Sequence, residues 1–293
     1  MNNLKIAGAP ISWGVCEVPG WGYQLGADRV LAEMRAVGLT ATELGPEGFL
    51  PSDPEELDAK LGSNDMHCVG IFVPVLLHDT DHDPLANIAD PLDALSACGA
   101  DVLVLAAATG ADGYDSRPTL EDAQWATLLA NLDRIADAAN DRGVLAVLHP
   151  HVGTMVETGS DVDRVLQGSS IKLCLDTGHL LIGGTDPLSL TLQVPDRIAH
   201  AHLKDVDAAL AARVQAGELT YTEAVRKGMY TPLGQGDVDI AGIVTALRAN
   251  GFDGWFVMEQ DTILDGEPAD EGPLRDVRTS VAFMHHVSGR VPA

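Results

Sequence analysis

The stretch of sequence that decides the fold is IKLCLDTGH (Ile171–His179), followed after a helix-length connection by IAHAHLKD (Ile198–Asp205). Each stretch opens with a short apolar run typical of a buried β-strand, and a helix-length connection suits a crossover between parallel strands. The same rhythm continues in both directions along the chain. It predicts eight strands, at Lys5–Pro10, Ala41–Leu44, His67–Val73, Val102–Ala106, Val144–His149, Ile171–Leu175, Ile198–His202 and Trp255–Glu259.

Helical patterns separate most of these strands, and several end at a glycine that can cap a helix in the left-handed conformation. They cover Ala27–Ala36, Leu85–Cys98, Leu120–Asp141, Asp161–Gln167 and Ile240–Ala249. An open, doubly wound sheet is the alternative for eight parallel strands, but APISWGVCEVPGWG follows the first strand in place of a Gly-rich phosphate-binding fingerprint. We therefore predict one domain, residues 1–293, that forms an α/β (β/α)8 TIM barrel.

The charge balance narrows the choice of partners. The formal net charge is −25 over 293 residues, and the 18 Lys and Arg residues are scattered. Such a surface repels nucleic acids and anionic membranes, so neither is an expected partner, and it weakly disfavours a phosphorylated substrate. The N-terminal MNNLKIAGAP shows no secretory signal, and no apolar run is long enough for a bilayer. The four cysteines are widely spaced, and Cys68 and Cys174 lie in strand-like runs, where we expect buried free thiols in place of a disulfide framework. These features predict a soluble cytoplasmic protein.

Polar side chains gather where the predicted strands end, which in a parallel barrel is the end that carries the active site. They are Glu43, His149, His151, Asp176, His179, His202, Lys204, Asp205 and Glu259. Imidazoles and carboxylates on four consecutive strands indicate a mixed nitrogen and oxygen site for a divalent metal ion. Such donors suit Mn²⁺, Co²⁺, Fe²⁺ or Zn²⁺ better than Mg²⁺.

Some strand-end residues carry a weaker signal. His200 shares a strand face with His202 but lies deeper in its strand, so we expect it to pack behind the site. Lys204 and Asp205 form either a surface ion pair or part of the site. Glu43 either caps the loop that follows its strand or takes part in catalysis.

Two connections at the strand ends are long enough to carry function. The first covers residues 206–239 and contains a helical stretch, Ala208–Ala216, and the Gly-rich sequence KGMYTPLGQGDVD. The second, Ser12–Tyr23, carries Trp13, which we expect either to form an apolar wall against a substrate ring or to pack in the core.

These motifs resemble the sugar phosphate isomerase/epimerase superfamily with xylose isomerase-like barrels, and within it the inosose dehydratases. The segments that carry the resemblance span most of the chain: Ala9–Trp13, Leu148–Thr154, Asp176–His179, His202–Val206 and Lys227–Asp239. DTGH and HLKD mark only the superfamily, whereas HPHVGT and GMYT point more narrowly to the dehydratases.

The resemblance implies a set of metal ligands: His149, Asp176, His202 and Glu259. The epimerases of the superfamily have a glutamate at the position of His149, and with it a pair of opposed glutamates that moves a proton between the two faces of a sugar. This chain lacks that pair, and a dehydration does not require it.

The resemblance also implies an activity, that of a metal-dependent lyase that dehydrates an inosose or a similar polyhydroxylated cyclic ketone through an enolate, with Mn²⁺ or Co²⁺ as the first choice of ion. It gives substrate contacts to His151, His179, Lys204 and Trp13, and catalytic roles to His151, Glu259, Lys204 and Glu43, the last as a second candidate base.

The nearest competing function is that of a sugar isomerase or epimerase on the same scaffold. A non-catalytic sugar-binding barrel and an endonuclease for abasic DNA would also be compatible with a barrel of this type, although the net charge of −25 disfavours the endonuclease. Related barrels form dimers or tetramers, so a homo-oligomer is compatible with the resemblance.

Overall fold

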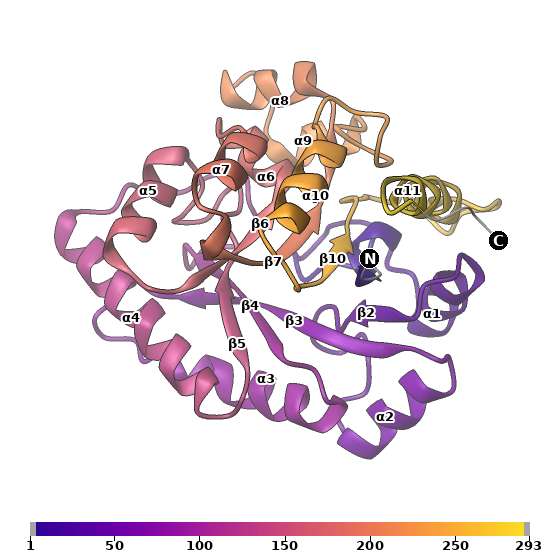
Figure 1. Ribbon diagram of the computed structural model, residues 1–293, viewed down its shortest axis with the longest axis horizontal. Coiled ribbons are helices and arrows are strands. Elements are labelled where there is room, and N and C mark those ends of the chain that lie inside the picture. The colour runs from indigo at the N-terminus through magenta and orange to yellow at the C-terminus, as the bar shows by residue number, and fades with distance from the viewer. Residues whose placement is uncertain (1–3, 290–293) are drawn as a thin grey trace.

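The computed structural model describes residues 4–289, and its central feature is a closed barrel of eight parallel strands (Figure 1). Around the barrel the strands follow the order β1 (Ile6–Gly8), β10 (Phe256–Met258), β7 (Ile198–Leu203), β6 (Lys172–Asp176), β5 (Leu145–Leu148), β4 (Val102–Ala108), β3 (His67–Leu76) and β2 (Ala41–Glu43). Each predicted strand coincides with one of these eight. The predicted (β/α)8 TIM barrel is therefore confirmed.

Helices surround the barrel and cover its outer face. The α-helices described, two of which (α8 and α9) belong to an insertion, are α1 (Ala27–Ala36), α2 (Pro54–Gly62), α3 (Leu85–Cys98), α4 (Asp122–Asn140), α5 (Gly159–Gly168), α6 (Thr177–Ile182), α7 (Pro187–Gln193), α8 (Ala208–Gln215), α9 (Tyr221–Arg226), α10 (Ile240–Ala249) and α11 (Pro273–Val287). Two short 3-10 helices, η1 (Pro10–Trp13) and η2 (Pro195–Arg197), complete the set within residues 4–289. The five helices expected from the sequence are all present.

The strands alternate between the barrel interior and the helices, as a period of two residues requires. In β6, Leu173 and Leu175 belong to the cluster that packs against the helices, whereas Cys174 belongs to a small cluster inside the barrel. Asp176 follows at the next inward position and is fully buried. Apolar side chains thus fill the barrel until the carboxyl ends of the strands, where polar side chains replace them.

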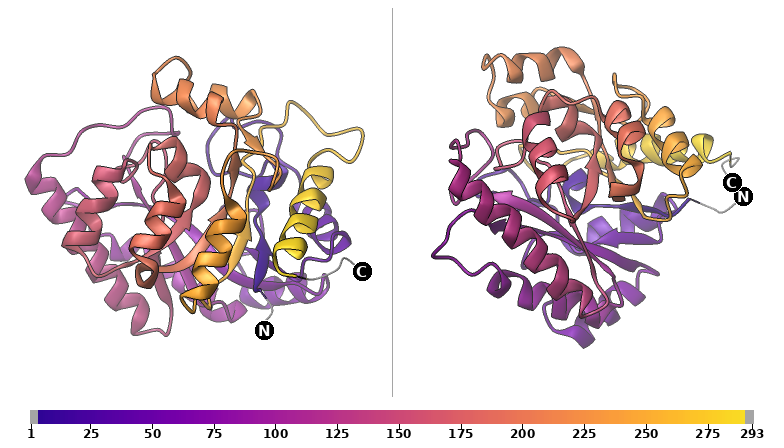
Figure 2. Two further views of the ribbon diagram at one scale, coloured as in Figure 1. Left: turned by 45° about the horizontal axis from the view of Figure 1, so that its top comes forward. Right: turned by 60° about the vertical axis from the view of Figure 1, so that its left-hand side comes forward.

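Residues 206–239 form an insertion at the carboxyl end of the barrel. It begins in β8 (Asp205–Val206), which pairs antiparallel with β9 (Tyr230–Thr231), and it carries α8 and α9. Helix α8 packs against α6, and in Figure 2 the insertion stands, in orange, at one end of the barrel. Within residues 4–289, none of the helices has the length and apolar character needed to cross a membrane.

Candidate active site

The DTGH sequence at the end of β6 builds one side of the site. Asp176 Oδ1 accepts hydrogen bonds from the backbone N–H groups of Gly178 (2.9 Å) and His179 (2.7 Å), so it caps α6 and fixes the carboxylate. The Thr177 hydroxyl donates to the backbone oxygen of Lys204 (2.7 Å) and joins the ends of β6 and β7. A Cβ atom at Gly178 would lie 2.7 Å from the Cβ of Lys204, so only glycine fits there.

The barrel register brings three of the four predicted metal ligands together. Asp176 pairs with His202 across β6 and β7, and the Glu259 backbone N–H donates to the oxygen of Leu203 (3.0 Å). Donor atoms of Asp176, His202 and Glu259 all lie within 4.8 Å of one another. The fourth predicted ligand, His149, lies one residue beyond β5, with its Nε2 3.0 Å from Asp176 Oδ2.

The spacing of these donors fits a single divalent ion. Donors about 2.1 Å from a shared ion lie roughly 3 to 4 Å from one another. Asp176 Oδ2 lies 3.0 Å from His149 Nε2 and 3.9 Å from His202 Nδ1, and His202 Nδ1 lies 3.1 Å from Glu259 Oε2. Among the residues described, the buried Nδ1 of His202, the nitrogen that faces Asp176 and Glu259, has no hydrogen-bond partner. The residues therefore fit a metal ion.

Glu43 lies behind His202 and fixes its orientation. Its Oε1 accepts hydrogen bonds from Nε2 of His202 (2.9 Å) and Nε2 of His200 (3.0 Å), so Nδ1 is the His202 nitrogen left to bind a metal ion. Burial would raise the pKa of Glu43, but His202 and His200 lower it to about 2. An ionised carboxylate already bonded to two imidazoles is a poor proton acceptor, so the geometry favours an orienting role for Glu43 over the predicted role as a base. His200 packs behind the site as expected.

Lys204 is the cation of the site. Its ammonium donates to Asp176 Oδ2 (2.8 Å) and Glu259 Oε2 (2.5 Å), and it lies 3.4 Å from Asp261 Oδ1. Burial by itself lowers the pKa of Lys204, yet Asp176, Asp261 and Glu259 together hold it well above its usual value. In turn, burial would raise the pKa of Asp176 and of Glu259, but nearby positive charges, Lys204 among them, lower both. Lys204 therefore stays charged beside ionised carboxylates.

Asp205 binds backbone amides of the insertion and does not form the surface ion pair with Lys204 that the sequence left open. Its carboxylate is fully buried and accepts four backbone N–H groups, those of Val206, Gly234, Gly236 and Val238. The alternative of a surface ion pair between Lys204 and Asp205 is therefore wrong. Asp205 organises the Gly-rich end of the insertion, while Lys204, its neighbour in the chain, faces the site.

His151 presents one imidazole nitrogen to the pocket. Its Nδ1–H donates to the backbone oxygen of Val152 (2.7 Å), which leaves the lone pair on Nε2. Burial, with the nearby His149 and Lys204, holds the pKa of His151 well below its ordinary value. The ring lies between His179 (centroids 3.6 Å apart) and Tyr114 (4.2 Å). His151 is therefore a neutral acceptor held in a fixed orientation.

His179 and Trp13 lie away from the pocket wall. Trp13 is fully buried in η1 and donates through Nε1 to Glu33 Oε2 (2.8 Å), so the predicted apolar wall at Trp13 is wrong and the alternative of core packing holds. Trp21, from the same loop, does line the pocket. His179 is fully buried and does not line the pocket, contrary to its predicted substrate contact. Its ring packs against His151, and its Nδ1 lies 3.4 Å from the Tyr230 hydroxyl.

Sequence reasoning missed Asp261, which lines the pocket three residues beyond β10. The Tyr221 hydroxyl donates to its Oδ2 and lies 3.0 Å from the Tyr230 hydroxyl. Burial raises the pKa of Asp261 to about 6, against the opposing charge of Lys204. No local pattern marks this residue, because Tyr221 and Tyr230 come from the insertion, 40 and 31 residues earlier in the chain.

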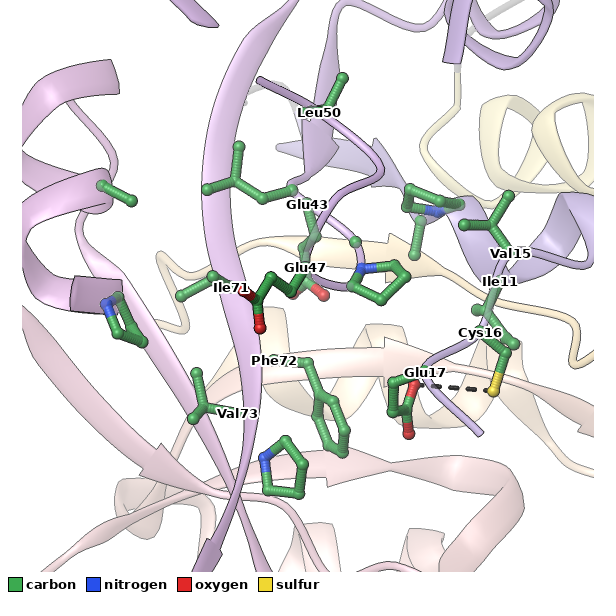
Figure 3. A pocket seen from close by; sticks show the side chains of 18 of the residues that line it. Ile11, Val15, Cys16, Glu17, Glu43, Glu47, Leu50, Ile71, Phe72 and Val73 are labelled. Atoms are coloured by element: carbon green, nitrogen blue, oxygen red, sulfur yellow. Dashed lines mark hydrogen bonds between the residues drawn. The ribbon is translucent and has the colours of Figure 1, made fainter. Parts of the chain in front are cut away.

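The pocket over these residues has a volume of about 840 Å³. Lys204 is the single Lys or Arg among the residues that line it within 4–289, beside seven acidic ones: Glu17, Glu43, Glu47, Asp90, Asp93, Glu259 and Asp261. Part of the wall appears in Figure 3, which labels Glu17, Glu43, Glu47 and Phe72 among the side chains that line the pocket. Such a lining offers little to a phosphate group and suits an uncharged, hydroxyl-rich ligand.

The comparisons with known proteins agree with this barrel. Residues 24–284 match the sequence profile of the family described as Xylose isomerase-like TIM barrel. The inosose dehydratase of Geobacillus kaustophilus (strain HTA426) is 32% identical, covering 98% of this chain and 97% of the relative. That of Lacticaseibacillus casei is 30% identical, covering 92% and 93%. A crystal structure of the IOLI protein with a binding zinc atom aligns with a TM-score of 0.70 at 14% identity, covering 98% of both chains, and shares the fold.

Proposed function

Because this chain belongs to the xylose isomerase-like TIM barrel family, we propose that it is a carbon–oxygen lyase that dehydrates an inosose or a similar polyhydroxylated cyclic ketone with the help of a divalent metal ion. The two inosose dehydratases that are 30% and 32% identical over nearly the whole chain support the reaction class. The observation that carries the proposal is the convergence of Asp176, His202 and Glu259 at the carboxyl end of the barrel.

The metal would be held by His149, Asp176, His202 and Glu259. When bound, it acts as a Lewis acid that polarises the ketone and makes the neighbouring C–H acidic. Two imidazoles and two carboxylates suit Mn²⁺ or Co²⁺, which we expect ahead of Mg²⁺, Fe²⁺ and Zn²⁺. Glu43 would keep the Nδ1 lone pair of His202 directed at the ion, because it accepts the Nε2–H.

The proton chemistry falls to His151 and Lys204 in this proposal. His151 Nε2 takes the proton from the carbon next to the ketone, since its Nδ1–H is already donated to Val152. The C–O bond on the following carbon then breaks, and the Lys204 ammonium, the buried proton donor of the pocket, protonates the departing hydroxyl so that it leaves as water. Water loss needs no second base on the opposite face, which agrees with His149 standing where an epimerase has a glutamate.

A substitution at Asp176 tests the proposal. Asp176→Asn keeps an oxygen to cap α6 but removes the charge that faces His149 and Lys204. Wild-type protein with Mn²⁺ should convert an inosose to a dehydrated product, followed by its ultraviolet absorbance and by mass loss of one water. The variant should not, while its circular dichroism stays that of the wild type.

The control variant is Asp253→Asn, whose carboxylate is exposed and pairs with Lys5 away from the site. It should react like the wild type. Two results would contradict the proposal: full turnover by Asp176→Asn, or exchange of a substrate hydrogen with solvent but no water loss, which indicates the epimerase. We further propose that the partner is a small polyol ketone or sugar, and that neither a nucleic acid nor a membrane binds here. A cytoplasmic location and a homo-oligomer stay predictions.

A further inference from the structure

One buried oxygen in the pocket has an unmet hydrogen-bonding capacity. Asp261 is 7% exposed and lines the pocket, yet its Oδ1 has no hydrogen-bond partner among residues 4–289. Lys204 Nζ, 3.4 Å away, forms an ion pair with this oxygen, but its two hydrogen bonds go to Asp176 and Glu259. A buried acceptor without a donor is costly, so this atom points to a donor that arrives with a ligand.

The second carboxylate oxygen of Asp261 is held from the insertion. Tyr221 is 2% exposed, and its hydroxyl donates to Asp261 Oδ2. Tyr221 opens α9, which a capping box at Thr220 begins, and the neighbouring Thr222 backbone N–H donates to Asp115 of the loop after β4 (2.8 Å). Because α9 is tied at this end, the Asp261 carboxylate has one oxygen fixed by a hydrogen bond and one buried oxygen left without a hydrogen bond.

We propose that Asp261 is a specificity-determining residue that accepts a hydrogen bond from one ring hydroxyl of the polyol, and that Tyr221 is the positioning residue that sets its orientation. The ligand class follows from the pocket, which offers acceptors and a single buried ammonium and therefore matches a neutral molecule rich in O–H donors. This inference rests on the proposed function, because the polyol is taken to be its substrate.

The consequence for specificity is a preference for one hydroxyl. A site built to hydrogen-bond a substrate hydroxyl rejects the analogue that lacks it far more strongly than an apolar pocket rejects a missing methylene. The insertion would thus influence which ring hydroxyls are accepted, because its Tyr221 orients Asp261. The barrel strands supply the metal ligands. Insertion and barrel then have separable tasks.

Binding of an unreactive cyclitol separates this inference from the reaction. We would titrate the Mn²⁺-loaded protein calorimetrically with scyllo-inositol, which has ring hydroxyls but no ketone. Asp261→Ala should weaken binding by at least about tenfold, the usual effect of losing one hydrogen bond to a charged group. The matched control is Tyr230→Phe, which removes a hydroxyl from the same cluster without touching Asp261 and should weaken binding less than Asp261→Ala.

A second variant guards against a folding defect. Tyr221→Phe should raise KM for an inosose roughly tenfold with a smaller change in kcat and an unchanged Mn²⁺ content, even where loss of the buried hydrogen bond to Asp261 lowers the melting temperature. A purely structural role would lower the melting temperature and leave KM unchanged. Binding of scyllo-inositol by Asp261→Ala as tight as by the wild type, or no binding by the wild type, would overturn the inference. A wild type that binds scyllo-inositol but dehydrates no inosose would instead overturn the proposed function and leave this inference standing.

Discussion

Substitution of Glu43 by Gln distinguishes an orienting residue from a base. Glu43 is 3% exposed and accepts from two imidazoles at 2.9 and 3.0 Å. Hydrogen bonds to a charged group contribute roughly 1.5–3 kcal/mol each, so complete removal by Glu43→Ala would cost roughly 3–6 kcal/mol of stability. That approaches the whole stability of many domains, roughly 5–15 kcal/mol. Gln keeps the shape and one acceptor oxygen of Glu43. Because a neutral acceptor makes hydrogen bonds about half as strong as a charged one, Glu43→Gln should lower the free energy of unfolding by roughly 1.5–3 kcal/mol.

The effect on the metal should be specific. Loss of a residue that orients a ligand histidine typically weakens metal affinity roughly 10- to 100-fold. That range corresponds to about 1.4–2.8 kcal/mol. We therefore expect Glu43→Gln to raise the Kd for Mn²⁺ by that factor, measured in competition with a chelator of known affinity, while kcat at saturating Mn²⁺ stays close to wild type.

The control is Glu47→Gln, because Glu47 lines the same pocket but is exposed and, within residues 4–289, forms no side-chain hydrogen bond. It should bind Mn²⁺ as the wild type does. The reasoning would be refuted if Glu43→Gln bound Mn²⁺ normally and lost kcat by roughly 100- to 10,000-fold, the signature of a missing general base.

Further variants test the rest of the site. His151→Gln should lower kcat roughly 100- to 10,000-fold, as for loss of a general base, at unchanged Mn²⁺ content; loss of Mn²⁺ would instead make His151 a ligand. Chelation should lower the melting temperature, since an ion at 100 times its Kd stabilises the fold by about 2.7 kcal/mol; identical thermal scans with and without Mn²⁺ would argue against a metal site. Gly236→Ala should lower the free energy of unfolding in urea by roughly 1–3 kcal/mol, because its Cβ would lie 2.3 Å from Asp205 Oδ1. The control Gly26→Ala, whose Cβ would lie in open space, should unfold like the wild type. Equal urea midpoints for the two variants would contradict this.

The barrel and the centre of the site could be predicted because both depend on local sequence. A strand-sized apolar run shows where β6 ends, and parallel strands of a barrel end on one side, so Asp176 and His202 had to converge. The DTGH sequence also encodes its own geometry, since the Asp176 cap needs the N–H groups of the next turn.

The remaining parts depend on contacts between distant segments. Glu43 meets His202 across 159 residues, and nothing near Glu43 indicates whether its carboxylate faces a substrate or an imidazole. Trp13 lies in a loop at the strand ends, where the sequence suggests a pocket. Its indole N–H instead donates to Glu33 of α1, and the side chain packs in the core. Asp261 acquires its environment from Tyr221 of the insertion. In each case the partner that determines where the side chain lies comes from a distant part of the sequence, so the residues next to it in the chain do not predict it.

The adjacent residues Lys204 and Asp205 connect two halves of the molecule through a single peptide bond. The Lys204 ammonium donates hydrogen bonds to Asp176 and Glu259 at the carboxyl end of the barrel. The Asp205 carboxylate accepts hydrogen bonds from four backbone N–H groups of the insertion. Since backbone amides supply these hydrogen bonds, they do not depend on the side chains of Val206 and Val238, whereas Gly236 leaves no room for a Cβ beside the carboxylate. Because Lys204 and Asp205 share one peptide unit, a displacement of the insertion would also displace the ammonium beside Asp176 and Glu259.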